Sequence, residues 1–313
     1  MVVITGGSSG IGRATALACA RRGDRLVLAA RSAVSLRAAA DECRAAGTEV
    51  EVVPTDVAAQ AEVDALLATA VERFGRVDAV VHSVTVVAYG RFEEVPAAAF
   101  DRVVATTLIG AANVSRAALR LFRDQGGGSL VIVGSLLGKI VTPYMSTYVT
   151  AKWGLQGLAR TLQVEARSTP GIRVSLVSPG SVDTPVYRQA ASYLGRDGRP
   201  PPPVVPPEKV ARAVVRCLDR PRRDVNVGVA NPMAILGFRT LPALFDALVT
   251  PLMRLGGLSR QPSEPNDGNV FVPHPDGDAV HGEWGRHWLR PASAGLAVLA
   301  VAGARLARRR ITR

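Results

Sequence analysis

Three side chains between positions 135 and 152 have the chemistry and the spacing to move a proton to or from an oxygen atom. Tyr148 and Lys152 are four residues apart, so they share a face if this stretch is helical. A cation beside a phenol favours the phenolate, so we expect Lys152 to lower the pKa of Tyr148 from its usual ~10. Ser135 follows the apolar run Leu130–Val133, which predicts a β-strand, and its hydroxyl could hold a carbonyl or alcohol oxygen beside the phenol. Such a trio needs a hydride carrier.

A glycine-rich loop near the N-terminus could bind that carrier. The run Val2–Thr5 predicts a strand, the sequence GGSSGIG follows it, and a helical pattern continues to Ala20. Glycines in the first turn between a strand and a helix let the backbone approach a pyrophosphate at the helix N-terminus. An unliganded structural turn is the alternative. The candidate cofactor residues of this loop are Gly6, Ser8, Ser9, Gly10, Ile11 and Gly12.

The end of the second predicted strand, Leu26–Ala30, indicates which dinucleotide would bind. NAD-specific proteins place an acid here for the ribose 2′-hydroxyl, whereas this chain has Arg31. A guanidinium suits a 2′-phosphate, so the sequence predicts NADP(H) as the cofactor. The alternative is a solvated arginine in an arginine-rich chain.

Strands and helices alternate along the first two thirds of the chain without hairpin signals. This alternation predicts an α/β fold with a parallel, doubly wound sheet and helices on both faces. Ser32 is the predicted N-cap of one helix, Gly75 ends another, and Pro96 begins a long helix that reaches about Arg123. The short polar motifs follow predicted strands, and ligands bind such sheets at the carboxyl ends of their strands. The remaining predicted strands are Val50–Val53, Val77–His82, Ser129–Val133, Arg173–Val177 and Asp224–Val229.

In combination, these motifs resemble those of the short-chain dehydrogenase/reductase family over residues 1–230. The resemblance rests on the Thr-Gly-x-x-x-Gly-x-Gly loop, the Asp56-Val57 pair, the Ser-x12-Tyr-x3-Lys spacing and the Pro179-Gly180 turn with Thr184 after it. It implies a Rossmann-like sheet of about seven strands that forms an NADP-binding catalytic domain.

The resemblance also implies roles for individual residues. Tyr148 would be the acid or base, Ser135 would polarise the substrate oxygen, and Lys152 would lower the tyrosine pKa and bind the nicotinamide ribose. The implied reaction is the NADP(H)-dependent interconversion of a carbonyl and an alcohol. The implied cofactor contacts are Asp56 and Val57 with adenine, Val182 and Thr184 with the carboxamide and phosphates, and Pro179 and Gly180 in the turn.

Two departures from the family pattern bear on activity. The family's Asn-Ala-Gly after the fourth strand corresponds to His82-Ser83-Val84, which places His82 and Ser83 beside the expected cofactor. The family's relay asparagine in the long helix corresponds to Thr107, whose hydroxyl has a shorter reach. These changes keep an alternative open, in which the protein binds the cofactor but catalyses weakly and acts as a sensor or a membrane-recruited scaffold.

The composition of the chain argues against several classes of function. The formal net charge is +12, but the chain has few lysines and much Ala, Arg, Gly and Val, so coding bias contributes to the excess of arginine. No nucleic-acid-binding motif accompanies the charge, so we expect no nucleic-acid partner. Three cysteines without a CxxC, and no signal peptide, predict a cytoplasmic protein with reduced thiols. The spacing of the histidines near positions 274–287 matches no ligand pattern, so we expect no metal.

The last quarter, residues 231–313, is predicted to be a C-terminal extension of irregular and helical structure. Before it, the Pro-rich segment that starts at Gly195 is expected to be a loop or lid without helix or strand. Residues 233–258 are apolar and are expected to cover the substrate pocket, which would make the substrate hydrophobic. A turn-rich loop, residues 261–285, follows.

The chain ends in an apolar run, residues 292–304, followed by five arginines. Three interpretations stay open for residues 291–313: a docking or oligomer helix, peripheral contact with an anionic membrane, and a true span. For the whole protein we expect a small hydrophobic carbonyl or alcohol as substrate and a homo-oligomer, either a dimer or a tetramer.

Overall fold

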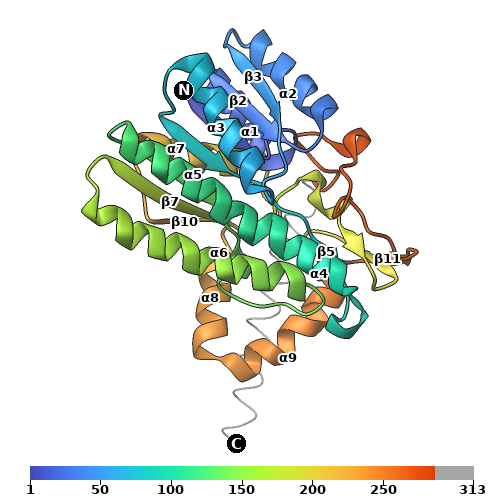
Figure 1. The fold of residues 1–313 in the computed structure, drawn as a ribbon. Coiled ribbons are helices and arrows are strands. Elements are labelled where there is room, and N and C mark those ends of the chain that lie inside the picture. The colour runs from blue at the N-terminus through green and yellow to red at the C-terminus, as the bar shows by residue number, and fades with distance from the viewer. Residues whose placement is uncertain (286–313) are drawn as a thin grey trace, which may run out of the picture.

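Seven parallel strands form the central sheet of the computed structural model, which describes residues 1–285 (Figure 1). Their order across the sheet is β10-β7-β6-β4-β1-β2-β3, so the chain starts in the middle and winds outward in both directions. The prediction of a parallel, doubly wound, Rossmann-like sheet is therefore confirmed. The strands are β1 (Val2–Thr5), β2 (Leu26–Ala30), β3 (Val50–Pro54), β4 (Ala79–His82), β6 (Gly128–Val133), β7 (Ile172–Pro179) and β10 (Asp224–Val227).

Helices cover both faces of this sheet. Successive strand residues point to opposite faces, and Val3 and Ile4 accordingly belong to two different buried clusters. Because both faces are buried, the inner strands consist of nearly continuous apolar runs. One face packs against α1 (Gly10–Ala20), α2 (Ala33–Ala45) and α7 (Pro207–Asp219), and the other against α3 (Gln60–Phe74), α5 (Gly110–Asp124) and α6 (Ser146–Glu165).

The ends of two helices show how the sequence fixes these boundaries. The Ser32 hydroxyl caps α2 by accepting the backbone N–H of Ser35 at 3.2 Å. Gly75 ends α3 with a φ of 80°, a left-handed conformation that favours glycine. Both residues were predicted as helix boundaries.

The long helix predicted from Pro96 to about Arg123 is interrupted by a wider turn, whose backbone hydrogen bonds follow the i→i+5 pattern. Helix α4 (Ala97–Val104) leads into a π-helical turn, Ala105–Ile109, before α5 begins. Such turns displace one residue from the regular helical register and occur often at functional sites. Thr107 lies in this turn.

Beyond the sheet the chain forms two further helices and several short strands. Helices α8 (Asn231–Thr240) and α9 (Pro242–Leu252) lie at the end of the molecule below α6 in Figure 1. The prediction that the Pro-rich segment contains no strand is wrong for the first residues of that segment. Strand β9 (Arg196–Gly198) precedes the prolines, so it keeps free backbone N–H groups and pairs antiparallel with β11 (Leu258–Pro262). Two-residue strands β5 (Ala88–Tyr89) and β8 (Ala191–Ser192) also pair.

Residues 266–285, here called the strap, run back over the carboxyl edge of the sheet. The strap starts at a bridge between Asn266 and Ser192, and Val270 is fully buried in a small cluster with Val103. Farther on, the Ala279 carbonyl accepts the backbone N–H of Gly10 at 2.8 Å. In residues 1–285 no helix has the length and apolarity that crossing a membrane requires. The expectations for residues 291–313 fall outside the described part of the chain.

Candidate active site

A cleft of about 1770 Å³ lies along the carboxyl ends of the strands. It brings together nearly all of the residues that the sequence singled out. Gly12 and His82 lie behind its walls. The predicted site residues that line it are Gly6, Ser8, Ser9, Gly10, Ile11, Arg31, Asp56, Val57, Ser83, Ser135, Tyr148, Lys152, Pro179, Gly180, Val182 and Thr184.

Ser135 is placed by the end of strand β6. It stands two residues after Val133 and caps a short 3₁₀ turn, Leu136–Gly138. Its hydroxyl oxygen accepts the backbone N–H of Leu137 at 3.0 Å. The hydroxyl hydrogen is not used in that bond, so Ser135 can donate it to an oxygen atom in the cleft.

Tyr148 and Lys152 lie on the first two turns of α6. The Lys152 ammonium is 5.5 Å from the centroid of the Tyr148 ring, and only 3% of the lysine is exposed. Its Nζ donates to the carbonyl of Val133 at 3.1 Å, which ties the helix to the end of β6. The i, i+4 pair therefore meets as the helical spacing requires.

Burial dominates the proton affinities of this pair. It raises the pKa of Tyr148 to about 12, although an interaction with the Ser135 hydroxyl acts in the opposite direction. Burial also lowers the pKa of Lys152 to about 7. The expectation that Lys152 lowers the tyrosine pKa below its usual value is thus wrong for the structure described. A lysine that is partly neutral near pH 7 attracts the phenolate less than a full cation would.

The glycine-rich loop holds its shape through close backbone contacts. Gly6 has a φ of 75°, and a Cβ there would lie 2.9 Å from the carbonyl carbon of Ser83. A Cβ on Gly12 would overlap the carbonyl oxygen of Gly6. Both positions therefore require glycine, and the loop presents the N-terminus of α1 to the cleft.

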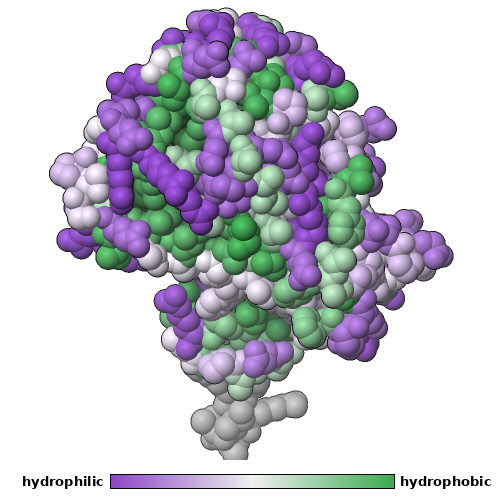
Figure 2. Space-filling model, in the orientation of Figure 1, coloured by the Kyte–Doolittle hydropathy of each residue, from purple (hydrophilic) through white to green (hydrophobic). Residues whose placement is uncertain are grey.

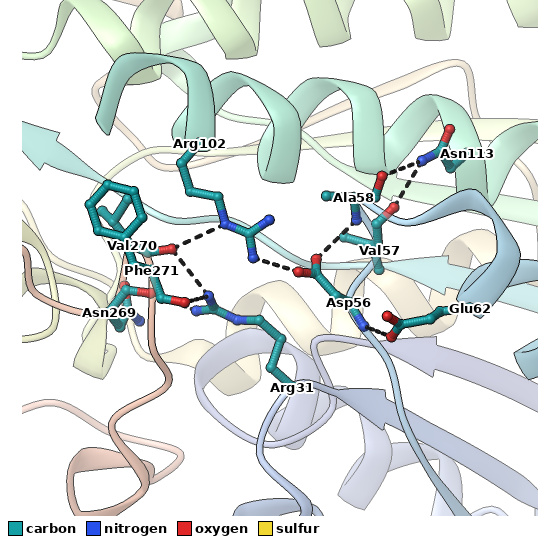
Figure 3. A network of polar contacts seen from close by, with 10 residues as sticks. All are labelled: Arg31, Asp56, Val57, Ala58, Glu62, Arg102, Asn113, Asn269, Val270 and Phe271. Carbon is teal, nitrogen blue, oxygen red and sulfur yellow. Dashed lines mark hydrogen bonds and ion pairs between the residues drawn. The ribbon is translucent and has the colours of Figure 1, made fainter. Parts of the chain in front are cut away.

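The opposite edge of the cleft carries a polar network between β2, β3, α4 and the strap (Figure 3). Arg31 donates to three successive carbonyls of the strap. Asp56 accepts from Arg102 of α4 at 2.5 Å. Burial alone would raise the pKa of Asp56, but the hydrogen bond from Arg102 holds it below its ordinary value.

Val57 is fixed by two residues of α5. The Asn113 side chain donates to the carbonyl of Val57 at 3.0 Å and to that of Ala58 at 3.2 Å. A Cβ on Gly110 would lie 2.5 Å from Val57 Cγ2, so the helix can approach this closely only with glycine. These contacts hold the Asp56-Val57 pair at the rim of the cleft.

His82 ends β4 and is fully buried. Its Nδ1 lies 2.9 Å from the hydroxyl oxygen of Thr5, and its Nε2 has no hydrogen-bond partner among the described residues. Burial, together with the nearby charge of Lys152, lowers the pKa of His82 to about 3. The imidazole is therefore neutral at physiological pH.

Thr107 and Thr85 form a hydroxyl pair at the cleft. Their Oγ1 atoms are 3.3 Å apart, and Thr107 Oγ1 also accepts the backbone N–H of Val86 at 3.4 Å. Thr85 lines the cleft, whereas Thr107 is fully buried. The threonine in the place of the family's relay asparagine thus reaches the cleft through a second hydroxyl.

The turn after β7 forms the remaining wall. Gly180 donates its N–H to Val227 at 2.9 Å, and Asn231 lies against it and donates to the carbonyl of Ser178 at 3.3 Å. Thr184 packs between two glycines, Gly10 of the loop and Gly282 of the strap.

One end of the cleft is apolar. It is lined by side chains of α8 and α9 that are about half or more exposed, and these belong to the region expected to cover the pocket. Large apolar side chains left this open to solvent usually mark a binding surface. They are Met233, Leu241, Leu244, Leu248 and Leu252.

Sequence reasoning missed Arg102, Thr85 and the strap. Arg102 is one of many arginines, and only the fold shows that it reaches Asp56. The turn-rich composition of the strap gave no sign that it completes the cleft. Within residues 1–285 no three His, Cys, Asp or Glu side chains are grouped to hold a metal ion, and His281 instead contacts Glu208 at 2.8 Å.

Comparisons with known proteins give one consistent result. The family model for short chain dehydrogenase matches residues 1–193. An uncharacterized oxidoreductase of Bacillus subtilis, YxnA, is 33% identical over 300 residues, which cover 94% of this chain and 83% of that protein. Levodione reductase has a similar structure, with a TM-score of 0.66, 28% identity, and coverage of 74% of this chain and 97% of that one.

A second solved structure is an alcohol dehydrogenase from the archaeon Thermococcus sibiricus in complex with 5-hydroxy-NADP. It has a TM-score of 0.61 and 33% identity, and the match covers 72% of this chain and 94% of that one. The two solved structures leave more than a quarter of this chain unmatched, whereas the Bacillus protein matches it into the C-terminal extension.

Proposed function

The chain belongs to the short-chain dehydrogenase family, and on that premise we propose that it is an NADP(H)-dependent oxidoreductase of hydrophobic carbonyls and alcohols. The observation that carries the proposal is the meeting of Ser135, Tyr148 and Lys152 in a cleft that has a glycine-rich loop at one side and apolar helices at the other.

The residues present fit a dinucleotide. Gly6 and Gly12 pack so closely that the loop brings the N-terminus of α1 to the cleft, where a pyrophosphate would lie, although the Gly10 N–H there is donated to the Ala279 carbonyl of the strap. Arg31 offers a cation at the end of β2, where a 2′-phosphate would lie. Lys152 would bind the nicotinamide ribose. The bound nicotinamide would supply or accept the hydride.

The chain's own groups would handle the proton. With a pKa of about 12, Tyr148 stays protonated at neutral pH and suits the role of an acid that protonates the oxygen of a carbonyl undergoing reduction. Ser135 would donate its free hydroxyl hydrogen to the same oxygen and so fix its position. In alcohol oxidation the same groups would act in reverse, with Tyr148 as the base.

The apolar side chains of α8 and α9 favour a hydrophobic substrate. Leu244, Leu248 and Leu252 lie one turn apart along α9 and line the same cleft as Tyr148. Burying such side chains against an apolar ligand contributes about 25 cal/mol for each Å² removed from water. A steroid, fatty acyl or aromatic carbonyl would fit this description.

We also propose that the protein is a homo-oligomer. On the face shown in Figure 2, apolar surface (green) runs between polar ridges over α5 and α6. Ile109, at the end of the π-helical turn before α5, and Trp153 and Val164 of α6 are each more than 40% exposed. Sedimentation velocity of the full chain would test this, and a monomer at micromolar concentration would contradict it.

The central experiment is a screen for NADPH oxidation with steroid, fatty acyl and aromatic carbonyls. Tyr148→Phe should abolish turnover and keep cofactor affinity, because the ring remains and only the proton donor is lost. Tyr144→Phe is the matched control, since Tyr144 lies on the same segment and its hydroxyl accepts from Arg254 at 2.9 Å.

Unchanged turnover in Tyr148→Phe would contradict the assigned chemistry. Cofactor binding without turnover of any carbonyl or alcohol would instead favour the weakly catalytic alternative. A preference for NADH that survives Arg31→Ala would contradict the choice of cofactor.

A further inference from the structure

We propose that Arg102 is a specificity-determining residue for the cofactor, because it pairs with Asp56 and so leaves Arg31 as a cation available to the adenosine 2′-phosphate. This inference rests on the proposed NADP(H) preference and adds a residue to it. The strap also takes part in this selection, because its backbone carbonyls accept hydrogen bonds from both arginines.

Arg31 has only neutral partners among the described residues. Its guanidinium donates to the carbonyls of Asn269 at 2.6 Å, Val270 at 3.1 Å and Phe271 at 3.3 Å (Figure 3). These three bonds use three of its five N–H groups, so two remain for another ligand. Because carbonyls carry no net charge, the full positive charge of Arg31 is kept at the rim of the cleft.

Asp56 is the carboxylate that could neutralise Arg31. It stands two residues after the neighbouring strand β3, and both residues line the same cleft. In the structure its Oδ2 is taken by Arg102 at 2.5 Å, and its Oδ1 accepts the N–H of Ala58 at 3.0 Å. Glu62 is directed elsewhere, to the backbone N–H of Asp56 at 2.7 Å.

Arg102 therefore acts on the 2′-phosphate site through Asp56. If Arg102 lost its charge, the carboxylate would be free to pair with Arg31, and it would also repel a phosphate dianion bound there. An acid at this edge without a counter-ion is the arrangement that favours an unphosphorylated ribose. With Arg102 present, the carboxylate keeps its hydrogen bonds and its charge is compensated.

The strap fixes the geometry of the two guanidiniums. The Val270 carbonyl accepts from Arg31 and, at 3.4 Å, from Nε of Arg102. The Val270 side chain is fully buried with Val103, the residue that follows Arg102 in α4. One buried residue thus holds both arginines at a set separation, so that Arg102 reaches Asp56 and Arg31 does not.

The experiment compares two nucleotides that differ in the 2′-phosphate. The affinities of the full-length protein for 2′,5′-ADP and for 5′-AMP are measured by calorimetry in wild type and Arg102→Gln. We expect Arg102→Gln to weaken 2′,5′-ADP binding about tenfold and 5′-AMP binding by less than about twofold. Adding Asp56→Asn to Arg102→Gln should restore most of the lost preference, because the uncompensated carboxylate is then gone.

Arg73→Gln is the matched control, since Arg73 makes a surface ion pair with Glu49 at 3.0 Å outside the cleft. Melting temperatures of all variants establish that each is folded. The proposal is overturned if Arg102→Gln binds 2′,5′-ADP like wild type, if it loses both nucleotides equally, or if Asp56→Asn restores nothing. A wild type that binds both nucleotides equally would overturn the proposed NADP(H) preference itself.

Discussion

Thr5 and His82 join the central strand β1 to its neighbour β4 at the carboxyl edge of the sheet. The Thr5 hydroxyl oxygen and His82 Nδ1 are 2.9 Å apart, and both residues are fully buried. The contact links the residue before the glycine-rich loop to the end of β4.

The acid stability of the protein should depend on His82. Its pKa is about 3 in the folded protein and 6.5 in the reference state, so the unfolded chain binds the extra proton first as pH falls. Stability is therefore kept above pH ~6.5 and lost progressively below it, by about 3 kcal/mol at a pH near 4.

The measurement is the free energy of urea unfolding against pH for wild type and His82→Asn. We expect a shallower acid decline in the variant, whatever its stability at neutral pH. His274→Asn, which changes an exposed histidine, serves as the control. Equal slopes for wild type and His82→Asn would exclude this role for His82.

The reduction rate should fall as pH rises through neutrality. Burial lowers the pKa of Lys152 to about 7, so the free enzyme loses the ammonium above that value, while Tyr148 keeps its proton. Because kcat/KM reports the free enzyme, kcat/KM for NADPH should decline on the alkaline side with an apparent pKa near 7. A profile that stays flat to about pH 9 would show that the ammonium is not required.

Thr107→Val should slow turnover without weakening cofactor binding. The substitution keeps the shape of the side chain and removes the hydroxyl that meets Thr85 at 3.3 Å. We expect kcat to fall about tenfold, which is less than the ~10²–10⁴-fold contributed by a group that itself transfers the proton, because these hydroxyls would only relay it. Thr106→Val is the control, because the Thr106 hydroxyl is buried without a partner among the described residues. Equal kcat values for wild type and Thr107→Val would remove the hydroxyl pair from the proton route.

Leu248→Asn should discriminate against large apolar substrates. The side chain lines the cleft from the middle of α9 and is 48% exposed, so a polar residue there is compatible with folding. If residue 248 no longer buries apolar surface against the ligand, the binding free energy weakens by about 1 to 2 kcal/mol. This raises KM about tenfold for a long substrate. A short carbonyl that does not reach α9 should be unaffected. If both substrates respond equally, α9 does not contact the substrate.

Regular elements and their ends could be predicted because local signals determine them. Apolar runs mark most strands of the central sheet, and Ser32 and Gly75 mark the boundaries of two helices. The short strands β5, β8, β9 and β11 could not be predicted in this way. Each pairs with a distant partner over only a few residues, so no periodic pattern develops.

The candidate site was predictable in part for the same reason. The loop, the Ser-Tyr-Lys spacing and Arg31 are short motifs at strand ends, whereas Arg102 acts through a contact with a residue 46 positions earlier in the chain. The pKa of Tyr148 differed from expectation because spacing shows which groups meet but not how deeply they are buried.

The strap has a consequence for the order of events during synthesis. Domains fold as they leave the ribosome, with N-terminal parts first. The sheet is complete at Val227, but the wall that orients Arg31 comes from residues 269–271. A nascent chain would therefore bring Ser135, Tyr148 and Lys152 together before residues 269–271 are available to orient Arg31 at the proposed 2′-phosphate site.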